Sequence, residues 1–222
     1  MIVEIPIIAG IIASSLHVLS GPDHLAAVTP MAIDAQSKVW RIGFSWGFGH
    51  LVGMLLIGLL FLLFQDAIPV ESISEYSEQL VAFVLIGIGL WSLYKIFYQK
   101  NKSRPHLAIS KVVNTNEKQH SELSKGGIQI KKNYAFSIGV LHGLAGVAHF
   151  LLLLPALGFV SQFESLQYIL GFAFGTLIAM SVYTYLLGKI NKRNPIFSLK
   201  TLRILGGAFA LVVGIYWLYL SL

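Results

Sequence analysis

Six long apolar runs, separated by polar segments, constrain the fold of this chain more than any other feature. They cover residues 5–29, 40–64, 79–98, 134–160, 166–188 and 202–222, and crossing a bilayer takes about 20 helical residues. Only 12% of the 222 residues are charged, against roughly 25% in soluble domains. We therefore predict an all-α polytopic membrane protein with six transmembrane helices.

The N-terminal segment and the absence of cysteine further restrict the kinds of membrane protein that this chain can be. The chain begins MIVEIP, with Glu4 where a signal peptide carries basic residues, so we expect the first run to be a transmembrane helix. The chain has no cysteine, which excludes disulfides, thiolate metal ligands and thiol catalysis.

Charged residues predict the orientation in the membrane. All 16 lysines and arginines lie near one set of run ends, within 38–41, 95–132 and 189–203. Basic residues favour the cytoplasmic side, so we expect both termini outside a plasma membrane. The segment 99–133 has eight basic and two acidic residues. We interpret it as a solvated cytoplasmic linker between two three-helix repeats, 1–98 and 134–222, of one membrane domain. Membrane lipids are expected partners of the protein, and its basic charge requires no nucleic acid.

The two halves of the chain resemble each other. An offset of 125 residues places HVLSGPDH on HGLAGVAH, and an offset of 126 places FGHLVGM on FGTLIAM. The alignment pairs His17 with His142, Gly21 with Gly146, His24 with His149, and His50 with Thr176. Because each half has three helices, the second half must cross the membrane in the opposite sense. Such inverted repeats are typical of secondary transporters.

A helix break is predicted inside the first apolar run. Gly21-Pro22 disfavours a continuous helix, and irregular backbone at membrane depth is tolerated only inside protein or beside a cavity. Pro22 suits the first turn of a restarting helix, where Asp23 would lie near the positive end of the helix dipole.

Ionisable residues at membrane depth are the candidate functional residues. They are His17, Asp23, His24, His50, His142 and His149. Imidazoles with one carboxylate favour a divalent Ni, Co, Zn or Fe(II) ion over calcium or magnesium. On a straight helix His17 and His24 would be about 10 Å apart along the axis, so a shared ion depends on the break. A structural hydrogen-bonding role is the alternative, and it is most open for His142 and His149.

The stretch HVLSGPDHLAAV followed by GFSWGFGHLVGM resembles the paired signatures of the nickel/cobalt transporter family, in particular its six-helix UreH-type members. The resemblance implies a permease in which His17, Asp23, His24 and His50 form the selective site. Nickel or cobalt would be bound transiently as cargo, without a resident cofactor. The chain has one residue more between His17 and Asp23 than the usual four, which leaves nickel and cobalt as alternatives.

We therefore predict uptake of a divalent transition-metal ion, nickel or cobalt, through one asymmetric site dominated by the first half. Efflux through the same site, a membrane metal- or haem-binding enzyme and an assembly subunit are the alternatives. We do not expect an enzyme, because no nucleophile constellation of Ser, Cys or Lys is present. Expected partners are a metallochaperone or the urease or hydrogenase maturation machinery.

Overall fold

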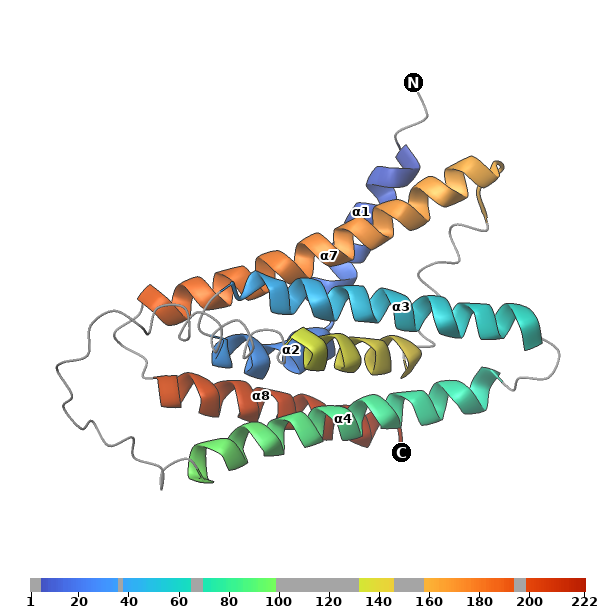
Figure 1. The fold of residues 1–222 in the computed structure, drawn as a ribbon. Helices are drawn as coiled ribbons and strands as arrows, with labels where there is room; N and C mark the ends of the chain where they lie inside the picture. The colour runs from blue at the N-terminus through green and yellow to red at the C-terminus, as the bar shows by residue number, and fades with distance from the viewer. Residues whose placement is uncertain (1–4, 36–37, 65–69, 99–131, 146–157, 194–198) are drawn as a thin grey trace, which may run out of the picture.

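The regular structure of this protein is helical. The computed structural model describes residues 5–35, 38–64, 70–98, 132–145, 158–193 and 199–222, and no strand occurs in these ranges (Figure 1). In chain order the helices are α1 (Ile5–Ser20), α2 (Pro22–Asp34), α3 (Trp40–Phe64), α4 (Val70–Tyr98), a helix over residues 132–145, α7 (Gln162–Arg193) and α8 (Leu199–Leu220). The predicted all-α fold is confirmed.

Four of these helices, α3, α4, α7 and α8, are long and apolar enough to cross a membrane, and α1 is a shorter apolar helix. Their outer faces carry large apolar side chains such as Leu63, Phe174 and Val212, which are 65%, 54% and 65% exposed. Such faces are stable against lipid, whereas contact with water would be unfavourable. The chain is a polytopic membrane protein.

The helix ends differ from the predicted spans in two places. α4 begins at Val70 rather than at 79, because VESISEYSE is polar but contains no glycine or proline that would end a helix. The predicted span 134–160 is helical over 132–145, and its last residues, 158–160, are not α-helical. Its middle lies outside the described residues, as does the linker up to residue 131.

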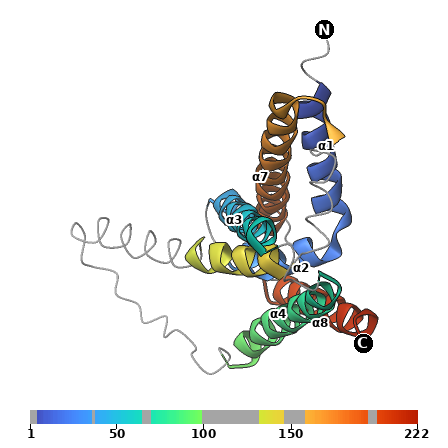
Figure 2. The ribbon, with the colours of Figure 1, turned by 90° about the vertical axis from the view of Figure 1, so that its right-hand side faces the viewer.

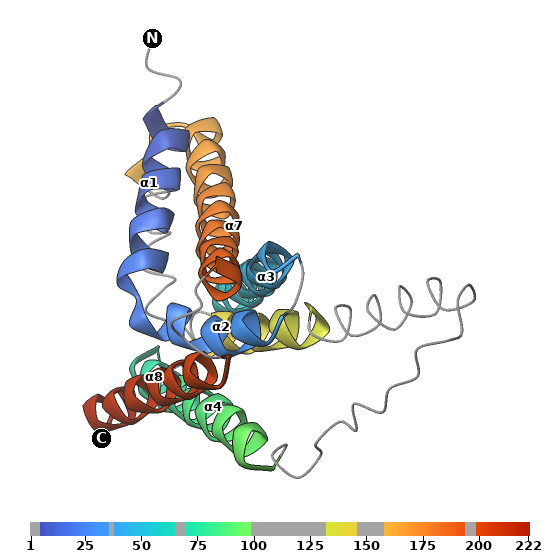
Figure 3. The ribbon, with the colours of Figure 1, turned by 90° about the vertical axis from the view of Figure 1, so that its left-hand side faces the viewer.

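The predicted break in the first span is confirmed. α1 ends at Ser20 and α2 begins at Pro22, and Gly21 between them is extended, with φ −80° and ψ 100°. Figure 3 shows α2 leaving the end of α1 at a steep angle. The proline lacks an N–H, and a helix start does not require one.

Equivalent contacts in the two halves support the inverted repeat. A Cβ on Gly49 of α3 would collide with the carbonyl oxygen of Phe136, and a Cβ on Gly175 of α7 would lie 2.7 Å from the carbonyl oxygen of Ile11 in α1. Gly49 and Gly175 are 126 residues apart, and Ile11 and Phe136 are 125 apart. Both pairs therefore use a glycine for close backbone approach. Figure 2 shows α1 beside α7, and α4 beside α8.

Polar contacts at the C-terminal half of α2 tie it to three other helices. Asp34 accepts hydrogen bonds from Lys95 of α4 at 2.9 Å and from Arg203 of α8 at 2.6 Å. Thr29 lies 2.6 Å from the Tyr183 hydroxyl of α7. These contacts hold in place the short helix whose first turn carries Asp23 and His24.

Candidate metal centre

The structure brings five of the six candidate residues together around the break. His17 lies in the last turn of α1, Asp23 and His24 in the first turn of α2, His50 in α3, and His142 in the helix over 132–145. Asp23, His24, His50 and His142 are 3%, 0%, 0% and 2% exposed, whereas His17 is half-buried. His149, the sixth candidate, lies outside the described residues.

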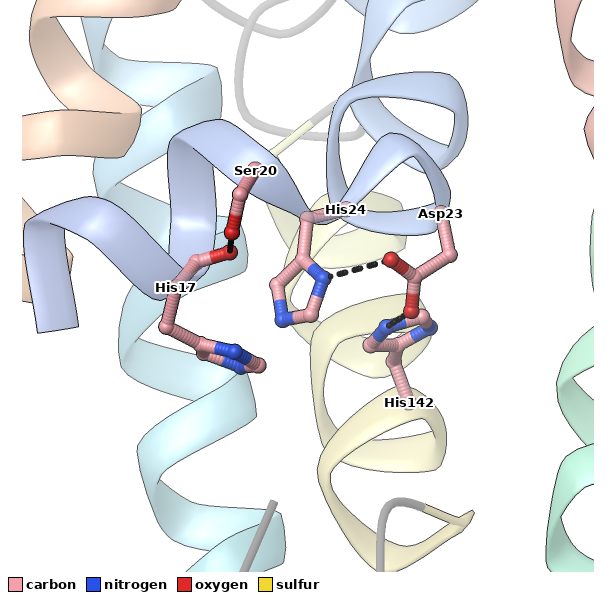
Figure 4. A network of polar contacts seen from close by, with 5 residues as sticks. All are labelled: His17, Ser20, Asp23, His24 and His142. Carbon is pink, nitrogen blue, oxygen red and sulfur yellow. Dashed lines mark hydrogen bonds and ion pairs between the residues drawn. The ribbon is translucent and has the colours of Figure 1, made fainter. Parts of the chain in front are cut away.

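The break brings His17 and His24 closer than a straight helix could. Their ring centroids are 4.6 Å apart in an edge-on arrangement, whereas seven residues of straight helix span about 10 Å. The Ser20 hydroxyl donates to the His17 carbonyl oxygen at 3.3 Å at the end of α1 (Figure 4). The break therefore brings His17 and His24 close enough for both to bind one ion, as a shared ion requires.

Asp23 joins the two halves of the protein. Its Oδ1 lies 2.9 Å from His24 Nδ1, and its Oδ2 lies 3.1 Å from His142 Nε2 (Figure 4). The carboxylate is in the first turn of α2, where the helix dipole favours a negative charge. It therefore orients an imidazole from each half of the chain.

The rings pack around His24. Its centroid is 5.1 Å from that of His50 and 4.7 Å from that of His142. The indole of Trp46 is stacked on His50 at 5.1 Å with an interplanar angle of 12°, and it also lies 5.3 Å from His142. Trp46 is fully buried.

Trp46 belongs to this cluster but was not among the candidate residues predicted from the sequence. A signal was present, because Trp46 precedes His50 by four residues and so shares its helix face. Its large apolar ring restricts the orientation of the His50 imidazole, a role that packing side chains commonly serve around a binding site.

Two groups of side chains can hold a metal ion: His17, His24 and His50, and Asp23, His24 and His142. Within each group the ligand atoms lie within 4.8 Å of one another. Nitrogen and carboxylate donors suit a divalent ion such as nickel, cobalt or zinc. Calcium and magnesium prefer oxygen ligands.

The cluster lies where the two repeats meet. His17 contacts Phe172 with ring centroids 6.5 Å apart, and the equivalent pair in the other half is His142 and Trp46. Thr176, the equivalent of His50, is buried and donates to the carbonyl oxygen of Phe172 in its own helix at 3.0 Å. The two repeats thus place equivalent aromatic rings beside His17 and His142, but only the first repeat supplies a histidine at the position of His50.

The fold and this centre define a polytopic membrane protein with a buried His/Asp cluster at the junction of two helical repeats. Residues 8–216 match the family described as the cytochrome C biogenesis protein transmembrane region, and the chain belongs to that family. The predicted membership of the nickel/cobalt transporter family is not confirmed, because the matching family is a different one.

Three curated relatives are similar to the chain. The Chloroplast proteins FOR GROWTH AND FERTILITY 2 and 1 of Arabidopsis thaliana are each 33% identical over 82% of this chain, which covers 47% and 49% of their lengths. The chain thus spans about half the length of these two relatives. The Urease accessory protein UreH of Bacillus sp. (strain TB-90) is 29% identical over 89% of this chain and 84% of its own length. No solved structure matches.

The matched family is a transmembrane region, in agreement with the long apolar helices of this chain. The names of these relatives describe accessory and growth proteins, and none names an enzymatic activity.

Proposed function

We propose that this protein carries a divalent transition-metal ion, nickel or cobalt, across the membrane through the His/Asp cluster. The observation that supports this most is the convergence of four imidazoles and one carboxylate on the broken helix, where the two inverted repeats meet. Ionisable groups at membrane depth are costly and therefore mark ion pathways. Inverted-repeat transporters bind their cargo at such a junction.

Uptake is the direction that we propose, with the protein in the plasma membrane and both termini outside. The basic residues then face the cytoplasm, as the positive-inside tendency favours. The similarity to a urease accessory protein supports delivery of the ion to urease maturation machinery or to a metallochaperone. The ion is cargo in this proposal, and the protein is not an enzyme.

Uptake of metal ions into proteoliposomes that contain only this chain tests the proposal. Ni²⁺, Co²⁺, Zn²⁺ and Mn²⁺ are offered outside, and we expect Ni²⁺ or Co²⁺ to accumulate. His24→Ala should abolish the accumulation, because His24 belongs to both groups of ligands. Thr176→Val is the matched control, because it changes a buried residue at the position equivalent to His50 and should preserve uptake.

The family match favours one second candidate, a subunit that binds a metal ion or haem during assembly of another protein without transporting it. This candidate is supported against transport if the purified chain binds metal ions stoichiometrically but moves no ion across the liposome membrane in either direction. Loading the liposomes with metal ions also tests efflux through the same site.

A further inference from the structure

His24 lies between two groups of candidate ligands. Its partners are His17 and His50 in one group, called here the outer group, and Asp23 and His142 in the other, called the inner group. The two groups share no residue except His24. They therefore describe two positions for an ion, one on each side of a single imidazole ring.

The two nitrogens of that ring face different groups. Nδ1 lies 2.9 Å from Asp23 Oδ1, and Nε2 is on the side of the ring that faces His17 (Figure 4). A neutral imidazole offers a lone pair on one nitrogen while the other nitrogen carries a proton. Two divalent cations on either side of one ring would also repel each other. The two positions can therefore be filled in turn but not together.

Burial and charge distinguish the two groups. The outer group includes the half-buried His17, whereas every member of the inner group is almost completely buried. The outer ligands are neutral imidazoles, and the inner group adds the carboxylate of Asp23. A dication loses hydration as it moves deeper, and a carboxylate offsets that loss by direct attraction.

We propose that the cargo ion occupies these two positions in succession, first the outer group at His17 and His50, then the inner group at Asp23 and His142. His24 belongs to both positions and passes the ion between them, and its single ring proton shifts from Nδ1 to Nε2 as the ion moves from Nε2 to Nδ1. The inference rests on the proposed function for its order of events, but the existence of two binding positions does not require transport.

A simpler arrangement would have one ion in the outer group, with Asp23 and His142 only orienting the ring of His24. Residues that orient a ligand typically change metal affinity about 10–100-fold when they are removed. They do not provide a binding position of their own when the outer ligands are lost. The two arrangements therefore differ in what a protein without His50 can bind.

Titration of the purified full-length chain with Co²⁺, followed by visible absorption, tests the inference. His50→Ala should leave the inner group and His142→Ala the outer group, so each variant should still bind one Co²⁺ per chain. Their spectra should differ, because one ion has two imidazoles and a carboxylate and the other has three imidazoles. His24→Ala and the double variant His50→Ala/His142→Ala should lose affinity by more than about 100-fold.

His50→Gln and His142→Gln repeat the test with side chains nearer in size to histidine, and Thr176→Val serves as the folding control. Loss of Co²⁺ binding by the His50 variants, with wild-type affinity in Thr176→Val, would overturn the inference in favour of one outer site. Identical spectra in the His50 and His142 variants would also contradict it.

Proteoliposome uptake separates this inference from the proposed function. In transport by two successive positions, the His50 and His142 variants bind the ion but fail to move it. If His142→Ala transports at the wild-type rate, the inner group is not on the path and the inference fails while the proposed function stands. If the two spectra are found and the wild-type protein moves no ion, the two positions stand and the proposed function fails.

Discussion

At Gly21 the backbone is extended, with φ and ψ values of −80° and 100° that other residues also adopt. A Cβ at this position would lie 2.7 Å from His24 Nδ1, 2.9 Å from Asp23 Oδ1 and 3.0 Å from the carbonyl oxygen of His17. Glycine is thus required for space rather than for backbone conformation. The absence of a side chain at Gly21 consequently allows His24 and Asp23 to pack closely against the break between α1 and α2.

Gly21→Ala should therefore weaken metal binding at unchanged protein abundance. The added methyl group would push His24 or Asp23 out of position, and we expect a loss of affinity of about 10–100-fold, as for other groups that orient ligands. Isothermal titration with Ni²⁺ measures the effect. Gly87→Ala is the matched control, because a Cβ there has no neighbour within 4 Å. Equal affinities for the two variants would show that the spacing at Gly21 does not matter.

At the residue scale, polarity predicted the candidate residues but not their distances. A histidine or an aspartate inside an apolar run is recognisable from sequence because burial of such a group is costly. Whether His142 reaches Asp23 depends on how the helix over 132–145 packs against the break, which linear spacing does not encode. Trp46 was missed for a related reason, because an aromatic residue in an apolar helix is ordinary until its ring is seen stacked on His50.

Among the elements, α2 depends on an ion-pair group at its C-terminal end. Asp34 uses both carboxylate oxygens, one for Lys95 of α4 and one for Arg203 of α8. Its side chain is 11% exposed, while those of Lys95 and Arg203 are 30% and 27% exposed. The group is partly shielded from water and joins three helices.

Asp34→Asn should destabilise the protein, because it removes the negative charge from two retained cations. A hydrogen bond to a charged group contributes about 2 kcal/mol, so we expect a clear fall in the thermal unfolding temperature in detergent. The change from carboxylate to amide in Glu164→Gln is the control, since no ion pair of Glu164 is found among the described residues. Unchanged unfolding temperatures for both variants would mean that the Asp34 group adds no stability.

The sequence also predicted the break between α1 and α2, because Gly-Pro chemistry acts locally. Hydropathy predicted α3 with the bounds that the structure has, 40–64, but placed the start of α4 nine residues late. The reason is physical: hydropathy marks the part of a helix that lipid surrounds, whereas a helix continues until a residue stops it. A search for apolar runs therefore misses the polar beginning of a helix, such as the one that starts at Val70 in α4.

For the whole molecule, the inverted repeat was predictable because an odd number of helices per repeat requires inversion. The equivalent glycine contacts of α3 and α7 support this symmetry. The difference between the repeats, with His50 in one and Thr176 at the equivalent position of the other, was visible in the sequence as well. The meeting of the repeats at His24 was not, since it depends on the steep turn from α1 into α2.

The proposed orientation predicts which positions are reached from outside the cell. The chain has no cysteine, so each introduced cysteine is a unique label site. Val160→Cys, at a fully exposed position just before α7, should react with an impermeant thiol reagent in intact cells. Lys118→Cys in the basic segment should react only after the cells are opened. Labelling of the Lys118 variant in intact cells would contradict the orientation.

We expect the cluster around His24 to bind the metal ion. X-ray absorption spectroscopy at the nickel K-edge, on the purified chain with one equivalent of Ni²⁺, tests it most directly. We expect nitrogen and oxygen neighbours at about 2.0–2.2 Å, with the outer-shell scattering that imidazole rings produce, and no such signal in His24→Ala. A wild-type spectrum without imidazole scattering, or one that His24→Ala leaves unchanged, would show that this cluster does not hold the ion.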